Sequence, residues 1–561
     1  MNGLQEPGGG GMERRAIIAT VLAVIVLILY QTFFLPTPPP RPPEPEREVV
    51  EETKPLAPVG VPQPLAKAPR IAGPLRRGER EEEIILETDL LRVVLTNRGG
   101  GVRSWQLKQY QEDTGPVDLV GTLPDETTPL PFTTWVHGGE GNRGLYRILE
   151  RPTPDPTKPQ RVVMEFQEAG GIVLEKTLVV YPGRYLADVR IRLRNLAKGA
   201  TQGGSIRLQW GPGFRLGAVN RGKVPPVPTA LIDGKQVTPD MEELEQELIQ
   251  SGRVSWTAIH DRYFAAALIP GEPGASSFVA KDGEGRPAVG LVYSAMNLPP
   301  GGETEAALKV YAGPKELTRL RDAGHNLQGL VDLGWFDFLA RPALYFLRFL
   351  NDFVGNYGVA IIIITVLQKV VFYPLTAKSH KSMQAMQMLQ PKLQAIKERH
   401  KNNPKKVNQE TMELYKKHGV NPFGGCLPMV IQIPIFIALY NALASSVELW
   451  RAPFALWIDD LSVADTLFSI PLAGDVFPFR GLPLVMGISM FIQQKMSPTG
   501  GDPRQAKMML YIMPVFFLFI FWRMPSGLVL YWLVNNVLQI GHQYHMNRGL
   551  GLSLSGGKES G

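Results

Sequence analysis

The chain has 561 residues, one cysteine and a formal net charge of +7, and 44% of its residues are hydrophobic while 20% are charged. This length predicts more than one domain, and the lone Cys426 excludes an internal disulfide and a cysteine-based zinc cluster. Apolar and charged residues occupy separate stretches, which is typical of a membrane protein.

The N-terminal region predicts a membrane anchor followed by a linker. Ala16 to Leu35 give 20 positions without a charge, enough at about 1.5 Å per residue to cross about 30 Å of hydrocarbon. Arg14 and Arg15 precede this span, which places the N-terminus in the cytoplasm. We expect residues 1–35 to hold the cytoplasmic N-terminus and an uncleaved first span. Residues 36–78, with 13 prolines, predict an extended linker.

Residues 79–330 predict an all-β sandwich. Between Tyr185 and Arg194 the odd positions are apolar and most even positions are charged, as in a half-buried strand. Short runs broken by glycine and proline recur throughout this region. Because an outward-going anchor precedes it, we expect an extracytoplasmic domain. Sugar binding is an alternative role that the fold class does not decide.

The remaining chain predicts helices in and along a membrane. Residues 331–356 favour an interfacial amphipathic helix, and packing on the β domain is the alternative. A second span is expected at 357–377, spans three to six within 423–546, and a flexible cytoplasmic tail at 547–561. Ten basic and three acidic residues lie between Thr376 and Phe423, which indicates a cytoplasmic loop. The charges of the loops favour six spans with both termini inside.

The basic loop, residues 378–422, predicts a cytoplasmic αα-hairpin. Its second helix should begin after Asn403 and end near Gly419. Flexible methionines can accept varied apolar segments, although an apolar stripe that holds the hairpin together is the alternative. The basic residues are topology determinants, or contacts for lipid headgroups or ribosomal RNA. The candidate contacts for apolar partner segments are Met383, Met386, Met388 and Leu389.

Lys369 is the unusual charge, because it lies inside the second span. It is about 13 Å deeper than Lys378, where a lysine costs up to about 3 kcal/mol in lipid. It should therefore face protein or water, unless its side chain snorkels to the surface. Polar residues on this and other spans favour a hydrated concavity around it, although amides that tie helices together are the alternative. These polar residues are Thr365, Gln432, Trp532, Asn535, Asn536 and Gln539.

Six stretches occur in order within residues 336–549. They are GNYGVAIIIIT, YPLTAKSHKSMQAMQMLQPKLQAIKER, VNPFGGCLPMVIQIPIFIALY, SSVELWRAPFALWIDDLS, FIQQKMSP and PSGLVLYWLVNN. In these stretches the chain resembles the YidC-type membrane protein insertases, whose relatives serve mitochondria and chloroplasts. The anchor with a large β domain is similar to the Gram-negative bacterial form of this family.

This resemblance implies a five-helix core with a hydrophilic groove that is open to the cytoplasm and to lipid and closed towards the periplasm. The basic residue of the groove, usually arginine, corresponds to Lys369, and a common tyrosine is replaced by Trp532. The membrane proteins to be inserted, called clients below, would enter the groove before their apolar segments slide into lipid. The implied partners are nascent membrane proteins, the Sec translocon, the bilayer and, as a further candidate, the ribosome, with the chain acting as a monomer in the bacterial inner membrane.

Two rival functions remain at this stage. The sequence holds no GxxxxGK[ST], HExxH or GxSxG motif, so we expect no enzyme activity, no catalytic residues and no cofactor. His542 and His545 lack a third ligand, and we expect surface histidines and no metal site. The second rival is an ion-coupled secondary transporter with Lys369 in its substrate site, although no repeated halves are visible.

Overall fold

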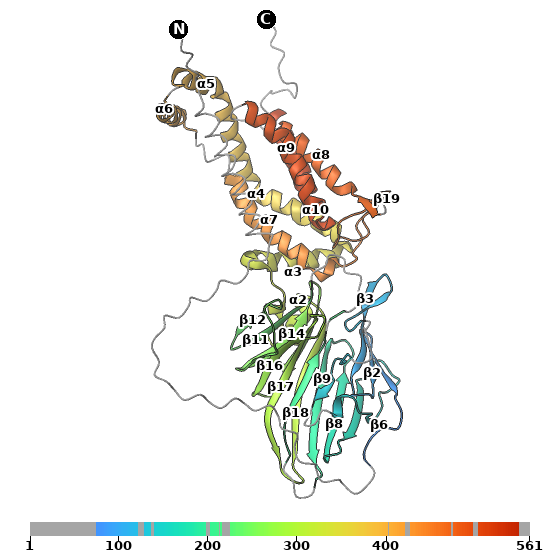
Figure 1. The fold of residues 1–561 in the computed structure, drawn as a ribbon. Coiled ribbons are helices and arrows are strands. Elements are labelled where there is room, and N and C mark those ends of the chain that lie inside the picture. The colour runs from blue at the N-terminus through green and yellow to red at the C-terminus, as the bar shows by residue number, and fades with distance from the viewer. Residues whose placement is uncertain are drawn as a thin grey trace, which may run out of the picture. The chain divides into compact units, whose positions relative to one another are not determined.

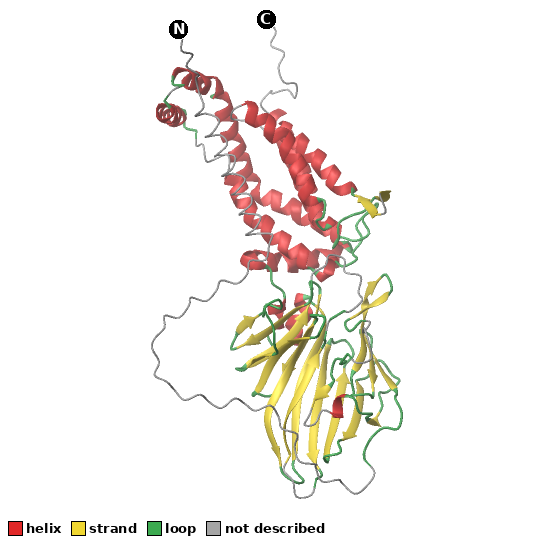
Figure 2. Cartoon of the chain, in the orientation of Figure 1, coloured by secondary structure: helices red, strands yellow, loops and turns green. Residues whose placement is uncertain are grey.

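The structure is a computed structural model in which strands β1 to β18 precede the main helices, and one further pair of strands lies between two of those helices (Figure 1, Figure 2). It describes residues 75–121, 128–135, 140–197, 202–212, 214–215, 225–401, 403–420, 427–472, 475–496 and 503–548. The expected first span, most of the linker, Cys426 and the tail from residue 549 lie outside the described residues.

The β domain is built around a long antiparallel sheet. Its strand order is β12-β11-β14-β15-β18-β9-β8-β7-β6. In chain order these strands are β6 (Arg147–Glu150), β7 (Gln160–Gln167), β8 (Ile172–Val180), β9 (Leu186–Asn195), β11 (Val227–Ile232), β12 (Lys235–Val237), β14 (Val254–His260), β15 (Phe264–Pro270) and β18 (Glu303–Pro314).

Two smaller sheets complete this domain, and a short 3-10 helix, η1 (Glu140–Asn142), lies between β5 and β6. One has the order β13-β16-β17-β10-β5, with β5 (Thr134–Trp135), β10 (Gln202–Trp210), β13 (Leu248–Gln250), β16 (Ala275–Lys281) and β17 (Pro287–Leu298). The other has the order β1-β2-β3-β4, with β1 (Glu83–Glu87), β2 (Leu91–Thr96), β3 (Val102–Glu112) and β4 (Gly115–Asp118).

Alternating side chains explain why the sheets pack together. On β9, Ala187, Val189, Ile191 and Leu193 are buried while Arg190 is exposed, as the alternation in the sequence predicts. Residues from all three sheets share one buried apolar cluster, in which Trp105 and Trp210 meet edge to face with ring centroids 5.8 Å apart. The prediction of a layered all-β domain therefore agrees with the structure.

The helical region begins with short elements and then forms a bundle around a second apolar cluster. The short elements are α2 (Leu317–Ala323), η2 (Leu327–Leu330) and η3 (Gly334–Phe336). The main helices are α3 (Asp337–Val354), α4 (Tyr357–Met388), α5 (Gln390–Arg399), α6 (Pro404–Lys417), α7 (Leu427–Ser445), α8 (Gly481–Met496), α9 (Pro503–Phe521) and α10 (Ser526–Arg548).

The segment between α7 and α8 contains more structure than the sequence predicted. It holds a 3-10 turn, η5 (Val447–Leu449), and a two-stranded antiparallel ribbon of β19 (Phe468–Leu472) and β20 (Asp475–Phe479). Phe468 and Phe479 stack across this ribbon with ring centroids 4.6 Å apart. The cross-strand aromatic pair stabilises a hairpin that the acidic composition of the loop does not indicate.

Helix length separates α4 from the other apolar helices. Among the described residues, α4 is the one helix that is both long and apolar enough to cross a membrane by length and composition. Shorter apolar helices cover Ile431–Ser445 and Leu510–Phe521. The 16 residues of α8 extend about 24 Å, less than a hydrocarbon core of about 30 Å.

Candidate functional site

The candidate site is organised by α4, whose start is fixed by its neighbours. The side chain of Asn356 caps the helix by accepting from the Val359 amide at 3.1 Å, and its own amide donates to the Phe454 carbonyl at 3.1 Å. A Cβ on Gly358 would lie 2.1 Å from the Phe454 ring, so this close approach requires glycine. Lys369 then lies 12 residues after Tyr357, about 18 Å along the helix.

The ammonium group of Lys369 faces α10. Its Nζ donates to Oε1 of Gln539 at 3.0 Å, and the Gln539 amide lies 2.8 Å from Nε2 of His380. The His380 ring meets the His542 ring with centroids 5.1 Å apart. These contacts form a polar chain between α4 and α10, two of whose members, His380 and His542, the sequence prediction did not assign to the site.

A cavity of about 370 Å³ lies beside this chain. Lys369, Gln539 and His542 line it together with apolar side chains such as Val370 and Leu538. Among the described residues, no carboxylate pairs with Lys369. An ammonium has three donors, and its one described acceptor is the Gln539 oxygen, so it can bind an additional polar or anionic group.

A second polar connection joins three helices. The Gln432 amide on α7 donates to the Tyr531 hydroxyl at 2.9 Å, and that hydroxyl donates to Oε1 of Gln368 at 3.3 Å. Tyr531 lies on α10 and is fully buried. Gln368 and Tyr531 were not predicted as site residues, although each is the direct sequence neighbour of one that was. That adjacency was the signal that could have identified them.

The other predicted groove residues have separate surroundings. Thr365 is buried and donates to the Ile361 carbonyl of its own helix at 2.6 Å. The amide of Asn536 donates to Ser489 of α8 at 3.1 Å, whereas Asn535 is half-buried. The structure therefore brings Lys369 and Gln432 into different hydrogen-bond networks.

Trp532 belongs to an aromatic cluster. Its ring lies 4.8 Å from Phe436, 5.6 Å from Phe517 and 5.3 Å from Phe521, between centroids. The indole Nε1 is buried and has no partner among the described residues. Among the described residues, no hydrogen bond connects the Trp532 indole with Thr365. The aromatic contacts indicate that Trp532 packs α7, α9 and α10 together.

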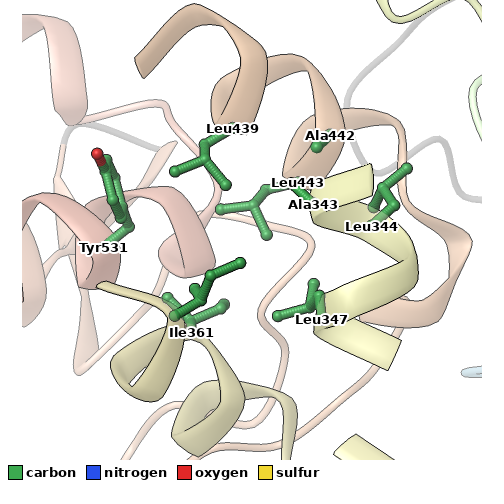
Figure 3. A pocket seen from close by; sticks show the side chains of 9 residues that line it. Ala343, Leu344, Leu347, Ile361, Leu439, Ala442, Leu443 and Tyr531 are labelled. Carbon is green, nitrogen blue, oxygen red and sulfur yellow. The ribbon is translucent and has the colours of Figure 1, made fainter. Parts of the chain in front are cut away.

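An apolar layer closes one side of these networks. Figure 3 shows a small cavity surrounded by leucines of α3 and α7 and by Ile361, with Tyr531 at its edge and the tyrosine hydroxyl directed away from the leucines. Its volume of about 10 Å³ is at the lower limit of the space for one water. The layer is thus tightly packed and apolar, and the Tyr531 hydroxyl points away from its leucines.

The predicted hairpin residues lie at the end of α4 and at the start of α5. α4 continues without a break across the expected boundary at residue 377, so Met383, Met386 and Met388 belong to α4. Met388 is 76% exposed, whereas Leu389 is buried where α5 begins. α6 starts at Pro404 with Asn403 as its cap, the start that the sequence predicted. The prediction that these residues contact clients stays a prediction.

Two protein families match successive parts of the chain. The 60Kd inner membrane protein family matches residues 349–551, which include every predicted groove residue. The YidC periplasmic domain family matches residues 83–346, which include the described sheets of the β domain.

Curated relatives match over most of their length. The membrane protein insertase YidC of Syntrophus aciditrophicus is 37% identical over 528 residues, which cover 90% of this chain and 94% of the relative. The insertase of Citrifermentans bemidjiense is 38% identical over 474 residues, covering 83% of this chain and 86% of the relative. These relatives are named as insertases, so the transporter alternative for Lys369 is not supported.

Solved structures carry the same name. An active YidC insertase with its first transmembrane domain resolved covers 94% of this chain and matches over 99% of its own chain, at 18% identity and a TM-score of 0.35. YidC from Thermotoga maritima covers 84% of this chain and matches over 99% of its own, at 16% identity and a TM-score of 0.29. At these scores the assignment rests on the sequence relatives and the family matches. The chain belongs to the YidC family of membrane protein insertases, which are non-enzymatic inner membrane proteins with a periplasmic domain.

Proposed function

We propose that this insertase receives the hydrophilic part of a nascent membrane protein beside Lys369 and releases the apolar segment into lipid. The observation that carries the proposal is the half-buried ammonium group of Lys369, which lies next to a cavity of about 370 Å³. Its described hydrogen-bond partner is a neutral amide, that of Gln539. A carboxylate of a client would supply the missing counter-charge, in a charge-assisted hydrogen bond worth about 1.5–3 kcal/mol. The polar segment then avoids part of the cost of entering hydrocarbon.

The groove in this proposal is closed on one side. The packed apolar layer around Leu347, Ile361 and Leu443 lies next to Tyr531, and it supports a barrier towards the periplasm. Gln432, Trp532, Asn535 and Asn536 would line the path or position its helices, and Thr365 would support the helix that carries Lys369. Short helices such as α8 would thin the bilayer locally and lower the same barrier.

The proposed topology has six spans with both termini in the cytoplasm. The first span lies at 16–35, and α4, α7, α8, α9 and α10 supply the others. The ten basic residues between 376 and 423 support a cytoplasmic position for α5 and α6. This αα-hairpin would receive clients first, with Met383, Met386, Met388 and Leu389 as apolar contacts. The Sec translocon and the ribosome are the proposed partners, and the chain acts as a monomer.

α3 would lie at the periplasmic surface of the inner membrane. One face of this helix region is exposed and aromatic, with Trp335 91% and Phe353 88% exposed, whereas Leu344 and Leu347 on the other face are buried. α3 packs on α4 and α7, and its Ala340 and Leu344 also join the apolar cluster that contains the β-domain core. The exposed aromatic face is therefore what supports the interfacial prediction.

The proposal is tested by replacing the groove cation in a strain depleted of its own insertase. We expect Lys369→Arg to restore insertion of a small client with an acidic external tail. Lys369→Ala should lower its insertion about tenfold, which corresponds to about 1.4 kcal/mol, and Lys369→Glu should lower it further because it repels the client. The measurement is protease protection of the pulse-labelled client.

Lys378→Ala is the matched control, because Lys378 is an exposed lysine on the same helix. A client whose external tail has no acidic residue tests charge specificity, and its insertion should change less than that of the acidic client. Equal insertion with arginine, alanine and glutamate at position 369 would remove this side chain from the mechanism.

A further inference from the structure

A second cavity of about 390 Å³ adjoins the Lys369 cavity. Tyr373 and His545 line both cavities, so the two are neighbours along the contact between α4 and α10. The second cavity is also lined by Lys381, Gln384 and two methionines, Met388 and Met546. These side chains have no role in the insertion mechanism proposed above apart from Met388.

The two cavities form one continuous seam. Residues of α4 from Val366 to Met388 that line the cavities fall within one half of the helix circumference at about 100° per residue. Leu538, His542 and His545 supply the facing side of α10. The seam therefore follows about 33 Å of α4.

The polar lining of the seam is basic. Lys369, Lys381, His542 and His545 are its titratable nitrogen groups, and no aspartate or glutamate lines either cavity. Among the described residues, no carboxylate forms an ion pair with Lys381. The Nε2 atom of His542 is buried and has no hydrogen-bond partner within the same part of the chain. The seam thus offers donors and positive charge without an internal anion.

Lys381 and His545 lie nearer the ends of their helices than Lys369 and the apolar side chains that flank it. Lys381 follows Leu375, the last residue of the apolar stretch, by six residues or about 9 Å, and His545 follows Gly541 by four residues or about 6 Å. Helix tilt shortens both distances along the membrane normal, so both groups lie at headgroup depth. Val366, Val370 and Leu538 line the deeper cavity, and Val370 is 65% exposed. From the cytoplasmic surface inwards, the seam therefore begins with Lys381 and His545 and continues with apolar side chains on both sides of Lys369.

We infer that the α4–α10 seam binds an anionic phospholipid of the cytoplasmic leaflet, with its phosphate at Lys381 and His545 and an acyl chain on Val366, Val370 and Leu538. A phospholipid has an anion at headgroup depth followed by hydrocarbon, which matches this order of residues. An acidic client segment would match the basic groups but not the exposed valines. The inference rests on the proposed topology, which places these helix ends at the cytoplasmic surface.

The test uses the full-length chain in nanodiscs of phosphatidylcholine and phosphatidylglycerol in about equal amounts, with retained lipids counted by native mass spectrometry. The wild-type chain should retain phosphatidylglycerol in preference to phosphatidylcholine. Lys381→Gln should lower this preference about fivefold, the effect of one lysine at a membrane surface. His545→Gln should lower it less, because a neutral imidazole offers the phosphate one hydrogen bond. Lys381→Arg keeps the charge and should retain the preference.

Lys378→Gln is the control, because this exposed lysine lies three residues from Lys381 and lines neither cavity. An equal loss in Lys378→Gln and Lys381→Gln would overturn the inference, because it would indicate unspecific surface charge. Displacement of phosphatidylglycerol by glycerol phosphate alone would assign the site to a free phosphate. Displacement by an acidic client peptide would assign it to clients. Lipid retention does not depend on insertion activity, so the Lys369 variants test the proposed function separately.

Discussion

At the residue scale, the β domain buries basic groups that have specific partners. Nζ of Lys176 is fully buried and donates to the carbonyls of Gly99, Gly100 and Phe132 at 3.1, 3.1 and 2.6 Å. Burial lowers the pKa of Lys176 to about 7. The three carbonyl acceptors act in the opposite direction, because they match the three donors of an ammonium. The lysine therefore holds the turn at Gly99 and Gly100 against β8.

His260 has a similar position at the end of β14. Its Nδ1 atom lies 3.3 Å from both Nζ of Lys315 and the Asp261 carbonyl oxygen, and its Nε2 atom lies 3.2 Å from the Thr229 hydroxyl. Burial, followed by the charge of Lys315, lowers the pKa of His260 from 6.5 to about 3. The neutral imidazole fits this site, because a proton on Nδ1 would face the lysine.

The low pKa of His260 predicts acid sensitivity of the β domain. The contribution of neutral His260 to the free energy of unfolding is fully present above about pH 6.5. Between pH 6.5 and 3 it decreases by about 1.4 kcal/mol for each pH unit, because the unfolded state binds the proton more readily than the folded state. His260→Gln should reduce the difference in stability between about pH 7 and about pH 5. Pulse proteolysis of the full-length chain in urea measures this difference.

His325→Asn is the control for this prediction. His325 is exposed and has a φ of 55°, a conformation that asparagine also adopts. Partial burial, followed by the charge of Lys309, lowers the pKa of His325 by a smaller amount than that of His260, so His325→Asn should reduce the acid sensitivity less than His260→Gln does. If His260→Gln and the wild-type chain lose equal stability on acidification, the neutral form of His260 does not determine that loss.

Residue patterns in the sequence predicted the exposed and buried faces of strands but not these buried basic groups. Alternation places Val189 and Ile191 in the core correctly. Lys176 lies on β8, where both faces are largely buried, and its three acceptors lie 77, 76 and 44 residues away along the chain. Such a partner depends on tertiary structure, which the local sequence does not encode.

At the element scale, helix starts were predictable and helix ends less so. α6 begins at Pro404 because Asn403 caps it and proline suits the first turn. α4 continues to Met388 because no helix-ending signal lies between Leu375 and that residue, and a change from apolar to polar composition does not end a helix. The candidate site was predictable as a set of polar residues in apolar helices. Its two separate networks were not, because they depend on how the helices are rotated.

The Tyr531 hydroxyl connects α4, α7 and α10 by hydrogen bonds, and a phenylalanine substitution removes this hydroxyl alone. Tyr531→Phe deletes the hydrogen bonds to Gln432 and Gln368 and leaves these two amides without that partner. We expect a loss of about 1–3 kcal/mol in the free energy of unfolding of the bundle. Thermal unfolding of the purified chain in detergent should show a lower Tm, with faster hydrogen exchange in α7 and α10.

The control is Tyr511→Phe, because Tyr511 on α9 is 60% exposed. This variant should unfold at the wild-type temperature. An equal Tm for Tyr531→Phe and Tyr511→Phe would mean that the aromatic contacts around Phe436, and not the hydroxyl, hold these helices together.

At the scale of the whole molecule, the chain combines two kinds of core. The β domain buries large aromatic residues such as Trp105, Trp210 and Trp256 in one cluster. The helical cluster is smaller and contains the polar networks at its edge. In the proposed function these polar groups lie at membrane depth, and the packed apolar layer beside Tyr531 would keep them from forming a continuous pore.

The proposed topology makes a prediction for the two ends of the helical bundle. With Cys426 replaced by serine, a single cysteine introduced at Asp240 or at Glu398 reports its side of the membrane, since both residues are exposed. A membrane-impermeant maleimide should label Asp240→Cys in intact spheroplasts. It should label Glu398→Cys only after lysis, because the basic loop that contains Glu398 stays in the cytoplasm. Labelling of Glu398→Cys in intact spheroplasts would reverse the orientation of α4 and place Lys369 in the outer half of the bilayer, where clients arriving from the ribosome could not reach it first.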